Sequence, residues 1–262
     1  MTEAKIVFLD EVGAGVNRLS LGVQSMVPHV LASLGRTHTM ANVAASVAMA
    51  RAAGVGSVNV DLIYGAAGES DDDWCGSVEA VLDLAPDHVS AYALTVEPGT
   101  ALAFDRSRHP DDDTQADRYR LADRLLGAAG LEWYEISNWA RPGHECRHNQ
   151  LTWAGGNYRG FGCAAHSHHD GRRWWNVRTP ERYASLVARG DAVIAGAEEL
   201  DDEARRLEAL HLAVRTRRGV PAGALGADDR AVLASLVVES GSGLSLTVEG
   251  RLLANEVAVR LR

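Results

Sequence analysis

Cysteine is scarce in this sequence. The 262 residues contain three cysteines, Cys75, Cys146 and Cys163, which lie far apart along the chain. Three separated cysteines do not make the disulfide framework of a small secreted domain, and the C-x-x-C pair of a zinc finger is missing. The scarcity therefore predicts a protein of a reducing compartment, the cytoplasm.

Long hydrophobic runs are also missing. No stretch of about 18 or more apolar residues occurs, so we expect no membrane-spanning helix. The beginning, MTEAKIVFLD, has acidic residues and no long apolar core, which is not the pattern of a signal peptide. Lys and Arg number 26 against 35 Asp and Glu, a formal net charge of -9. Because nucleic-acid binders usually carry a basic face, we expect no nucleic-acid partner.

The first half of the chain alternates apolar runs with Ala-rich helical stretches. This alternation predicts β-α-β units and a parallel sheet. The expected strands are Arg18–Val23, Ser57–Tyr64, His88–Val96 and Glu132–Ile136, and the expected helices are Met40–Ala53, Asp71–Leu84 and Thr114–Ala129. Three or four parallel strands cannot close a barrel. We therefore expect a partial α/β barrel with an open edge near Asn17–Val23, through which copies of the chain self-associate.

The pattern breaks after Ser137. The stretch 137–171 is rich in Gly, Asn, His and aromatic residues without a clean period, so we expect a long functional loop there. Regular pattern resumes with a strand at Arg172–Asn176 and with helices at Pro180–Arg189 and Glu203–Arg215. The end of the chain predicts a helix, a short strand and a helix, at Asp228–Val238, Leu244–Thr247 and Val248–Leu261. We therefore expect two domains, a barrel part at 1–190 and a small winged-helix-like α+β appendage at 191–262.

Polar residues lie in or just after the first two strands. Gln24 and Ser25 follow the first strand, where parallel α/β folds bind ligands, although an ordinary turn with a serine helix cap is the alternative. Asp61 lies inside an apolar strand, where a carboxylate needs a partner or a ligand; the alternative is that it faces the mouth of the barrel. Arg36, in the loop 34–38, is either a clamp for a carboxylate or a solvated surface residue.

Histidines are concentrated in one short segment. Five of the ten histidines and two of the three cysteines lie between His144 and His169. Imidazole and thiolate bind soft and borderline metals, but the intervening Gly and aromatic residues suit a flat apolar ligand better than a closed zinc site. A haem axial ligand requires an exposed imidazole over an apolar slot. The candidates are His148 or His166, with Trp153, Tyr158 and Phe161; the alternative is that these histidines are structural or solvated.

Six motifs follow one another along the chain: NRLSLGVQS at 17–25, LGRTH at 34–38, DLIYG at 61–65, YEISN at 134–138, RHN at 147–149 and RWWNV at 173–177. In this combination the chain resembles the haem chaperone HemW family. That family is a close relative of oxygen-independent coproporphyrinogen III oxidase in the radical SAM superfamily. The resemblance covers nearly the whole chain and implies a radical SAM type of barrel.

The resemblance also implies a set of ligand contacts. The residues that match contacts to S-adenosylmethionine are Gln24, Arg36, Asp61 and Thr95. The family's proposed haem motif, H-N-x-x-Y-W, stands here as HNQLTW at 148–153, with Thr152 in the place of the tyrosine. It implies that His148, Asn149 and Trp153 contact haem and that His148 binds the haem iron.

The cysteine pattern departs from the family. Radical SAM proteins hold a 4Fe–4S cluster with C-x-x-x-C-x-x-C or a close variant, and the sequence has no such motif. We therefore expect the chain to match the C-terminal two-thirds of a HemW-like protein, with the cluster loop of the complete form preceding Ala14. Without three thiolates there is no cluster to reduce S-adenosylmethionine, so we expect binding rather than radical catalysis from this chain.

Three functions remain open at this point. The first is a haem chaperone that accepts haem and passes it to a client protein, with S-adenosylmethionine and the cluster as cofactors of the complete form. The second is a coproporphyrinogen dehydrogenase-like oxidoreductase of porphyrin biosynthesis, against which the missing cysteines count. The third is an inactive truncated fragment.

Overall fold

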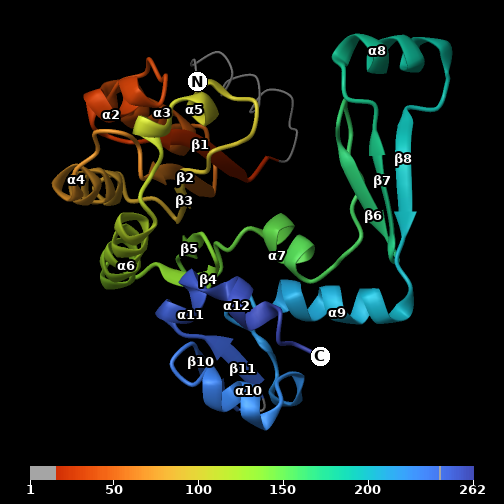
Figure 1. Ribbon diagram of the computed structural model, residues 1–262. Helices are drawn as coiled ribbons and strands as arrows, with labels where there is room; N and C mark the ends of the chain where they lie inside the picture. Colours follow the sequence, from red (N-terminus) through yellow and green to blue (C-terminus); the bar gives the residue numbers. More distant parts are fainter. Residues whose placement is uncertain (1–15, 242) are drawn as a thin grey trace. The chain divides into compact units, whose positions relative to one another are not determined.

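The computed structural model describes residues 16–241 and 243–262. The described residues form two compact units, which divide between residues 145 and 146 (Figure 1). We predicted a boundary between residues 190 and 191, whereas the structure groups residues 146–190 with the C-terminal part of the chain. Among the described residues, no helix is long and apolar enough to cross a membrane.

The first unit contains a mixed sheet with the strand order β1-β2-β3-β5-β4. Its strands are β1 (Arg18–Gln24), β2 (Ser57–Tyr64), β3 (His88–Ala93), β4 (Glu132–Glu135) and β5 (Asn138–Ala140). Its helices are α2 (Pro28–Ser33), α3 (Met40–Ala52), α4 (Asp71–Leu82), α5 (Ala101–Phe104), the 3-10 helix η1 (Arg106–Arg108) and α6 (Asp112–Ala128). The strands β1, β2 and β3 pair in parallel, as the alternation of strands and helices predicted.

The fourth predicted strand, β4, does not pair with β3. The short strand β5 lies between them and is antiparallel to both. The turn at Ile136 and Ser137 explains this arrangement, because two residues can join antiparallel strands whereas parallel strands need a long crossover. The parallel part of the sheet therefore ends at β3, and a hairpin continues the sheet.

The two faces of this sheet differ sharply. One face carries apolar side chains that are almost fully buried, among them Val58, Val60, Leu62, Val89 and Trp139. Helices α4 and α6 pack on it through two ring pairs, Tyr64 with Trp74 at 5.2 Å and Tyr119 with Trp139 at 5.5 Å. Each such side chain contributes about 1.5–3 kcal/mol of burial free energy, so this face holds the core. The opposite face carries polar side chains and forms part of the candidate site.

Local signals set where the helices begin. Thr39 and Ser70 lie directly before α3 and α4, and each makes a capping box with the third residue of its helix. These side chains accept hydrogen bonds from backbone N–H groups that have no partner inside the helix. The observed helices begin where predicted at Met40 and Asp71 and end one or two residues earlier than predicted.

The second unit contains two antiparallel sheets, with the strand orders β6-β7-β8 and β10-β11-β9. Its strands are β6 (His166–His169), β7 (Arg172–Asn176), β8 (Ile194–Glu199), β9 (Val220–Pro221), β10 (Val237–Ser240) and β11 (Gly243–Leu246). Its helices are α7 (Arg147–Trp153), α8 (Pro180–Arg189), α9 (Asp202–Ala213), the 3-10 helix η2 (Ala222–Ala224), α10 (Ala227–Val232), α11 (Val248–Leu252) and α12 (Ala254–Ala258).

Two predictions for the chain after Ser137 were wrong in detail. The stretch 137–171 is not an irregular loop, because it contains β5, α7 and β6. The helix expected at Asp228–Val238 ends at Val232, and Val237 and Val238 belong to β10, which pairs with β11. β-branched residues next to a turn favour a hairpin strand over a continued helix, which accounts for the second difference.

Candidate ligand-binding sites

A hydrogen-bonded network covers the polar face of the first sheet. The side-chain amide of Asn59 donates to Ser20 Oγ and to Asp61 Oδ1, both at 2.7 Å. Ser20 Oγ donates to the other oxygen of Asp61 at 2.8 Å. These side chains come from neighbouring strands, since Ser20 lies beside Asn59 in the parallel register. The carboxylate of Asp61, which was the unexplained polar residue of an apolar strand, is thus held at both oxygens.

His88 closes this network on the side of β3. Its Nδ1 lies 2.5 Å from Asn59 Oδ1 and its Nε2 lies 2.8 Å from the hydroxyl of Tyr134. Burial, with a contribution from the charge of Arg18, lowers the pKa of His88 to about 3. The ring is therefore neutral at pH 7. Because an amide oxygen only accepts, Nδ1 donates to Asn59 and Nε2 accepts from Tyr134.

Gln24 lies at the end of β1 in a strained conformation. Its φ of 68° is in the left-handed region, which costs a residue other than glycine about 1–3 kcal/mol. The register between β1 and β2 shifts at this point, after Gly22 pairs with Asp61. A Cβ on Gly22 would lie 2.8 Å from Nε2 of Gln24, so glycine leaves room for the amide to fold back over the strand. The bulge thus brings the Gln24 amide to the strand position opposite Asp61.

The other two predicted S-adenosylmethionine contacts lie in loops. Arg36 is exposed and lines a cavity of about 380 Å³ together with Thr37 and His38. His38 Nε2 lies 2.8 Å from the carbonyl oxygen of Val23, which ties this loop to the end of β1. Thr95 lies beyond the end of β3, and its exposed hydroxyl donates to the carbonyl of Ala93 at 3.4 Å. Gln24 and Asp61 therefore share the polar face, Arg36 belongs to an adjacent loop, and Thr95 is not drawn into the network.

Tyr92 is a polar-face residue that the sequence did not single out. It follows His88 and Ser90 at alternate positions of β3 and is 42% exposed. Burial raises the pKa of its hydroxyl and nearby Asp61 adds to the rise, while hydrogen bonds with Ser90 and Asn138 oppose it. The alternation of polar residues in this strand was the signal that could have identified it.

The histidine segment contributes a cluster of rings in the second unit. His148, Asn149 and Trp153 lie on the short helix α7, with His148 exposed and Trp153 half-buried. The His148 ring centroid is 6.2 Å from that of Tyr158, and the two rings meet edge to face. Tyr158 in turn lies 6.2 Å from His168, with which it forms an isolated β-bridge.

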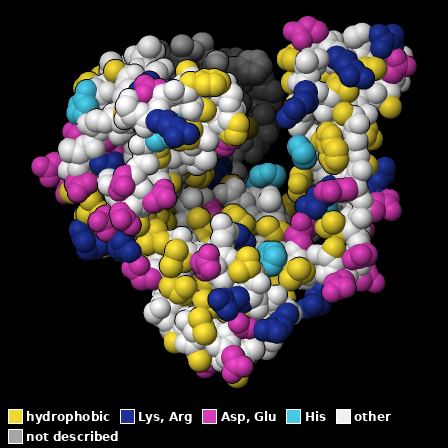
Figure 2. All heavy atoms as spheres, viewed as in Figure 1, with side chains coloured by type: hydrophobic (Ala, Val, Ile, Leu, Met, Phe, Trp, Pro, Cys, Tyr) yellow, Lys and Arg dark blue, Asp and Glu magenta, His cyan; other side chains and the backbone are white. Residues whose placement is uncertain are grey.

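The remaining histidines of the segment differ in their partners. His168 Nδ1 lies 3.0 Å from the carbonyl oxygen of Gly156, and its Nε2 accepts from the backbone N–H of Gly171. His169 pairs with Asp170 at 3.3 Å. His166 is exposed and stacks on Trp175 with a centroid distance of 5.8 Å. We call His148, Tyr158, His166, His168 and Trp175 the aromatic cluster. Figure 2 shows histidine among hydrophobic side chains on the part of the surface that carries β6 to β8.

A cavity of about 270 Å³ lies at the other face of β7. Trp174, which alternates with Trp175 along the strand, lines it together with Phe161 and Tyr183. Arg172 lies over the Trp174 ring at 5.6 Å from its centroid. Phe161 is 81% exposed, so its ring is available to an apolar ligand. The structure therefore places Phe161 away from the cluster around His148, although the sequence grouped the two as one candidate slot.

The cysteines do not fit an iron–sulfur cluster. None of the three forms a disulfide, and Cys75 lies on α4 in the first unit whereas Cys146 and Cys163 belong to the second. Burial and the nearby Glu79 raise the pKa of the Cys75 thiol, which disfavours the thiolate that iron requires. Within the described ranges, no group of three or more His, Cys, Asp or Glu could hold a metal ion. A haem iron is different, because the porphyrin supplies four nitrogen ligands and the protein needs to add only one or two.

The fold is that of a radical SAM protein. The structure matches coproporphyrinogen III oxidase (HemN) from Escherichia coli, described as a radical SAM enzyme, with a TM-score of 0.82 and 21% identity. The match covers 99% of this chain and 66% of that one. It confirms the predicted fold class.

Sequence comparison defines the family more narrowly. The chain is 49% identical over 253 residues to the heme chaperone HemW of Mycobacterium tuberculosis and 32% identical over 274 residues to that of Bacillus subtilis. The first match covers 93% of this chain and 65% of the relative, and the second covers 98% and 72%. No family model matches the chain. The chain belongs to the heme chaperone HemW family, and it spans 65% of the length of the mycobacterial relative.

Proposed function

We propose that this protein binds haem through the aromatic cluster and passes it to a client protein, as a haem chaperone. The observation that carries the proposal is the exposed imidazole of His148, which meets the Tyr158 ring at 6.2 Å in a member of the HemW family. Imidazole is the commonest proximal ligand of haem iron, and aromatic rings bind the apolar face of a porphyrin. Haem is the cargo in this proposal, and the protein supplies its binding and release.

The residues of α7 have different roles in haem binding. His148 presents its ring on the exposed side of the helix and binds the iron. Asn149 and Trp153 lie on the same helix, where Trp153 offers an apolar surface to the macrocycle. Thr152 stands in the place of the family tyrosine, and its hydroxyl donates to the backbone carbonyl of His148 at 3.0 Å. That bond turns the Thr152 hydroxyl toward the helix backbone. We therefore assign Thr152 no contact with haem.

The polar face of the first sheet suits S-adenosylmethionine. Asp61 is fixed at both oxygens by Ser20 and Asn59, yet it is only partly buried and keeps acceptor sites for the hydroxyls of a ribose. Gln24 adds an amide at the same edge of the sheet, and Arg36 adds a guanidinium for a carboxylate. Bound S-adenosylmethionine would supply methyl or radical chemistry, but the cysteines present do not fit the cluster that reduces it. We therefore propose a binding role for this face.

Decarboxylation of a porphyrinogen has weaker support. The likeness to coproporphyrinogen III oxidase is one of fold, at 21% identity, and the described residues offer no set of ligands for a reducing cluster. The family match and the free imidazole both favour haem binding.

A haem titration tests the proposal. We expect the purified chain to shift the Soret band of added haem to that of a histidine-ligated species. His148→Ala should weaken binding by about tenfold, which corresponds to about 1.4 kcal/mol. His109→Ala is the matched control, because His109 lies in the first unit and its ring meets the carbonyl of Leu102. A native chain that leaves the Soret band unchanged would contradict haem binding.

A further inference from the structure

The described histidines differ in whether their ring nitrogens are already engaged. Most of them meet a carbonyl, a carboxylate or another side chain: His29, His38, His88, His109, His144, His168 and His169. In the described part of the chain, His148, His166 and His211 show no hydrogen bond or ion pair at the ring. Of these three, His148 and His166 contact an aromatic ring. His166 therefore has the same two properties that make His148 a ligand for haem iron.

The neighbours of His166 hold its ring in place. His166, Trp175 and Gly196 lie side by side on β6, β7 and β8, since Trp175 pairs with both of the others. A Cβ on Gly196 would lie 2.5 Å from Cζ2 of Trp175, so glycine allows the indole to lie flat across β8. The imidazole then stacks on the indole at an interplanar angle of 29°. Stacking of this kind fixes the orientation of the ring and leaves its nitrogens free.

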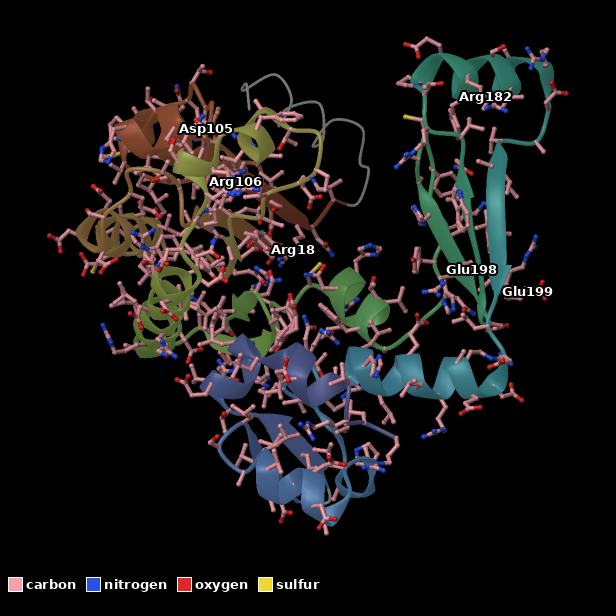
Figure 3. The ribbon with its side chains drawn as sticks, viewed as in Figure 1. Arg18, Asp105, Arg106, Arg182, Glu198 and Glu199 are labelled. Carbon is pink, nitrogen blue, oxygen red and sulfur yellow. The ribbon has the colours of Figure 1, made fainter. Side chains whose placement is uncertain are left out.

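The adjacent row of the same face is closed to a ligand. There His168, Arg173 and Glu198 lie side by side. Arg173 pairs with Glu198 at 2.8 Å and with Glu208 at 2.6 Å, and both ring nitrogens of His168 meet backbone groups. Figure 3 shows Glu198 on β8. Of these two rows of paired residues, the one that contains His166 is therefore the one with an imidazole whose nitrogens are available to bind a metal.

We propose that His166, held by Trp175, is a second ligand for haem iron on the aromatic cluster and an alternative to His148. This inference rests on the proposed haem binding. The Tyr158 ring lies 6.2 Å from the ring of His148 on α7 and 6.2 Å from the ring of His168, which is two residues from His166 on β6. An imidazole nitrogen of His166 donates a lone pair to the iron, and Trp175 is a positioning residue. With two alternative histidine ligands, haem can stay bound to one histidine while the other dissociates from the iron.

Variants in the His148→Ala background test this inference. We expect that variant to keep a histidine-ligated Soret band at about tenfold lower affinity. His148→Ala/His166→Ala should lose that band and bind haem at least about tenfold more weakly again. The matched control is His148→Ala/His169→Ala, because His169 points to the other face of β6 and pairs with Asp170. It should bind haem like His148→Ala alone.

Three further substitutions test the role of Trp175. In the His148→Ala background, Gly196→Ala should weaken the remaining haem binding although His166 is intact, because the added Cβ displaces the indole. Trp175→Phe should bind more tightly than Trp175→Ala, since a ring remains for stacking. Circular dichroism would confirm that each variant is folded.

If His148→Ala alone abolishes the histidine-ligated band while the native chain shows it, His166 is not a ligand and the proposed function still holds. If the native chain shows no shift, the proposed function itself fails.

Discussion

His88 is a histidine that the fold keeps uncharged. Burial lowers its pKa to about 3, whereas a histidine in an unfolded chain has a pKa of about 6.5. Between these values the unfolded chain binds more protons than the folded one. The contribution of neutral His88 to stability is therefore complete above pH 6.5 and is lost as the pH falls toward 3.

This difference predicts a dependence of stability on pH. We expect the free energy of unfolding to fall by about 1 kcal/mol between pH 6.5 and 5.5 because of His88 alone. Urea unfolding of the native chain and of His88→Gln at both pH values measures it, and the variant should lose less stability than the native chain. His109→Gln, at an exposed ring outside the network, should follow the native chain. Equal losses in the native chain and in His88→Gln would show that the protonation of His88 does not limit stability.

Single residues explain why the polar network could not be foreseen in full. Asp61 was identifiable because a carboxylate inside an apolar strand needs a partner. Its partner Asn59 lies two residues away on the same face of β2, whereas its partner Ser20 depends on the register between β1 and β2, which a sequence period does not fix. The strained φ of Gln24 is likewise a property of the bulge rather than of the residue.

Among the helices and strands, the sequence predicted those that are long enough for their hydrophobic pattern to repeat several times. Helices α3, α4 and α6 have 13, 12 and 17 residues, with caps or stop signals, and all three were foreseen. Among the elements that were missed, β5, α7 and β6 have three, seven and four residues. Segments this short do not repeat a period, and β6 reads HSHH with no apolar side chain. Pairing with β7 makes it a strand, so only the fold could reveal the aromatic cluster.

The C-terminal sheet contains a position where glycine is required. Gly219 directly precedes β9, has a φ of 67°, and would place a Cβ 1.9 Å from the carbonyl oxygen of Leu244 in β11. We expect Gly219→Ala to destabilise the chain by at least about 2 kcal/mol, because the backbone strain adds to the overlap. Gly223→Ala is the matched control, since a Cβ there meets nothing within 4 Å. Chemical denaturation compares them, and equal stabilities would contradict a close approach of β9 to β11.

For the molecule as a whole, the two compact units each have an apolar core. In the first, Leu62, Trp74 and Trp139 are fully buried, and in the second, Leu225, Leu244 and Val257 are. The first core also contains an ion pair, in which Arg118 donates to Glu69 at 2.8 Å with the side chains 6% and 0% exposed. Burial raises the pKa of Glu69 and the charge of Arg118 opposes the rise. Removal of Arg118 would therefore leave a buried carboxylate without its counterion, at a cost of about 3–5 kcal/mol.

Separate cores predict separate unfolding transitions, because chains with several domains commonly depart from two-state behaviour. In scanning calorimetry we expect Arg118→Met to lower the melting temperature of one transition and Gly219→Ala to lower that of the other. The double variant should show both shifts with little coupling, since the substitutions share no partner. Arg118→Lys is the matched control in the first unit, because it keeps a positive charge beside Glu69. A single transition that moves with either substitution would mean that the units fold as one. In that case haem binding to the second unit would also raise the melting temperature of the first, whereas independent units confine that stabilisation to the transition that Gly219→Ala lowers.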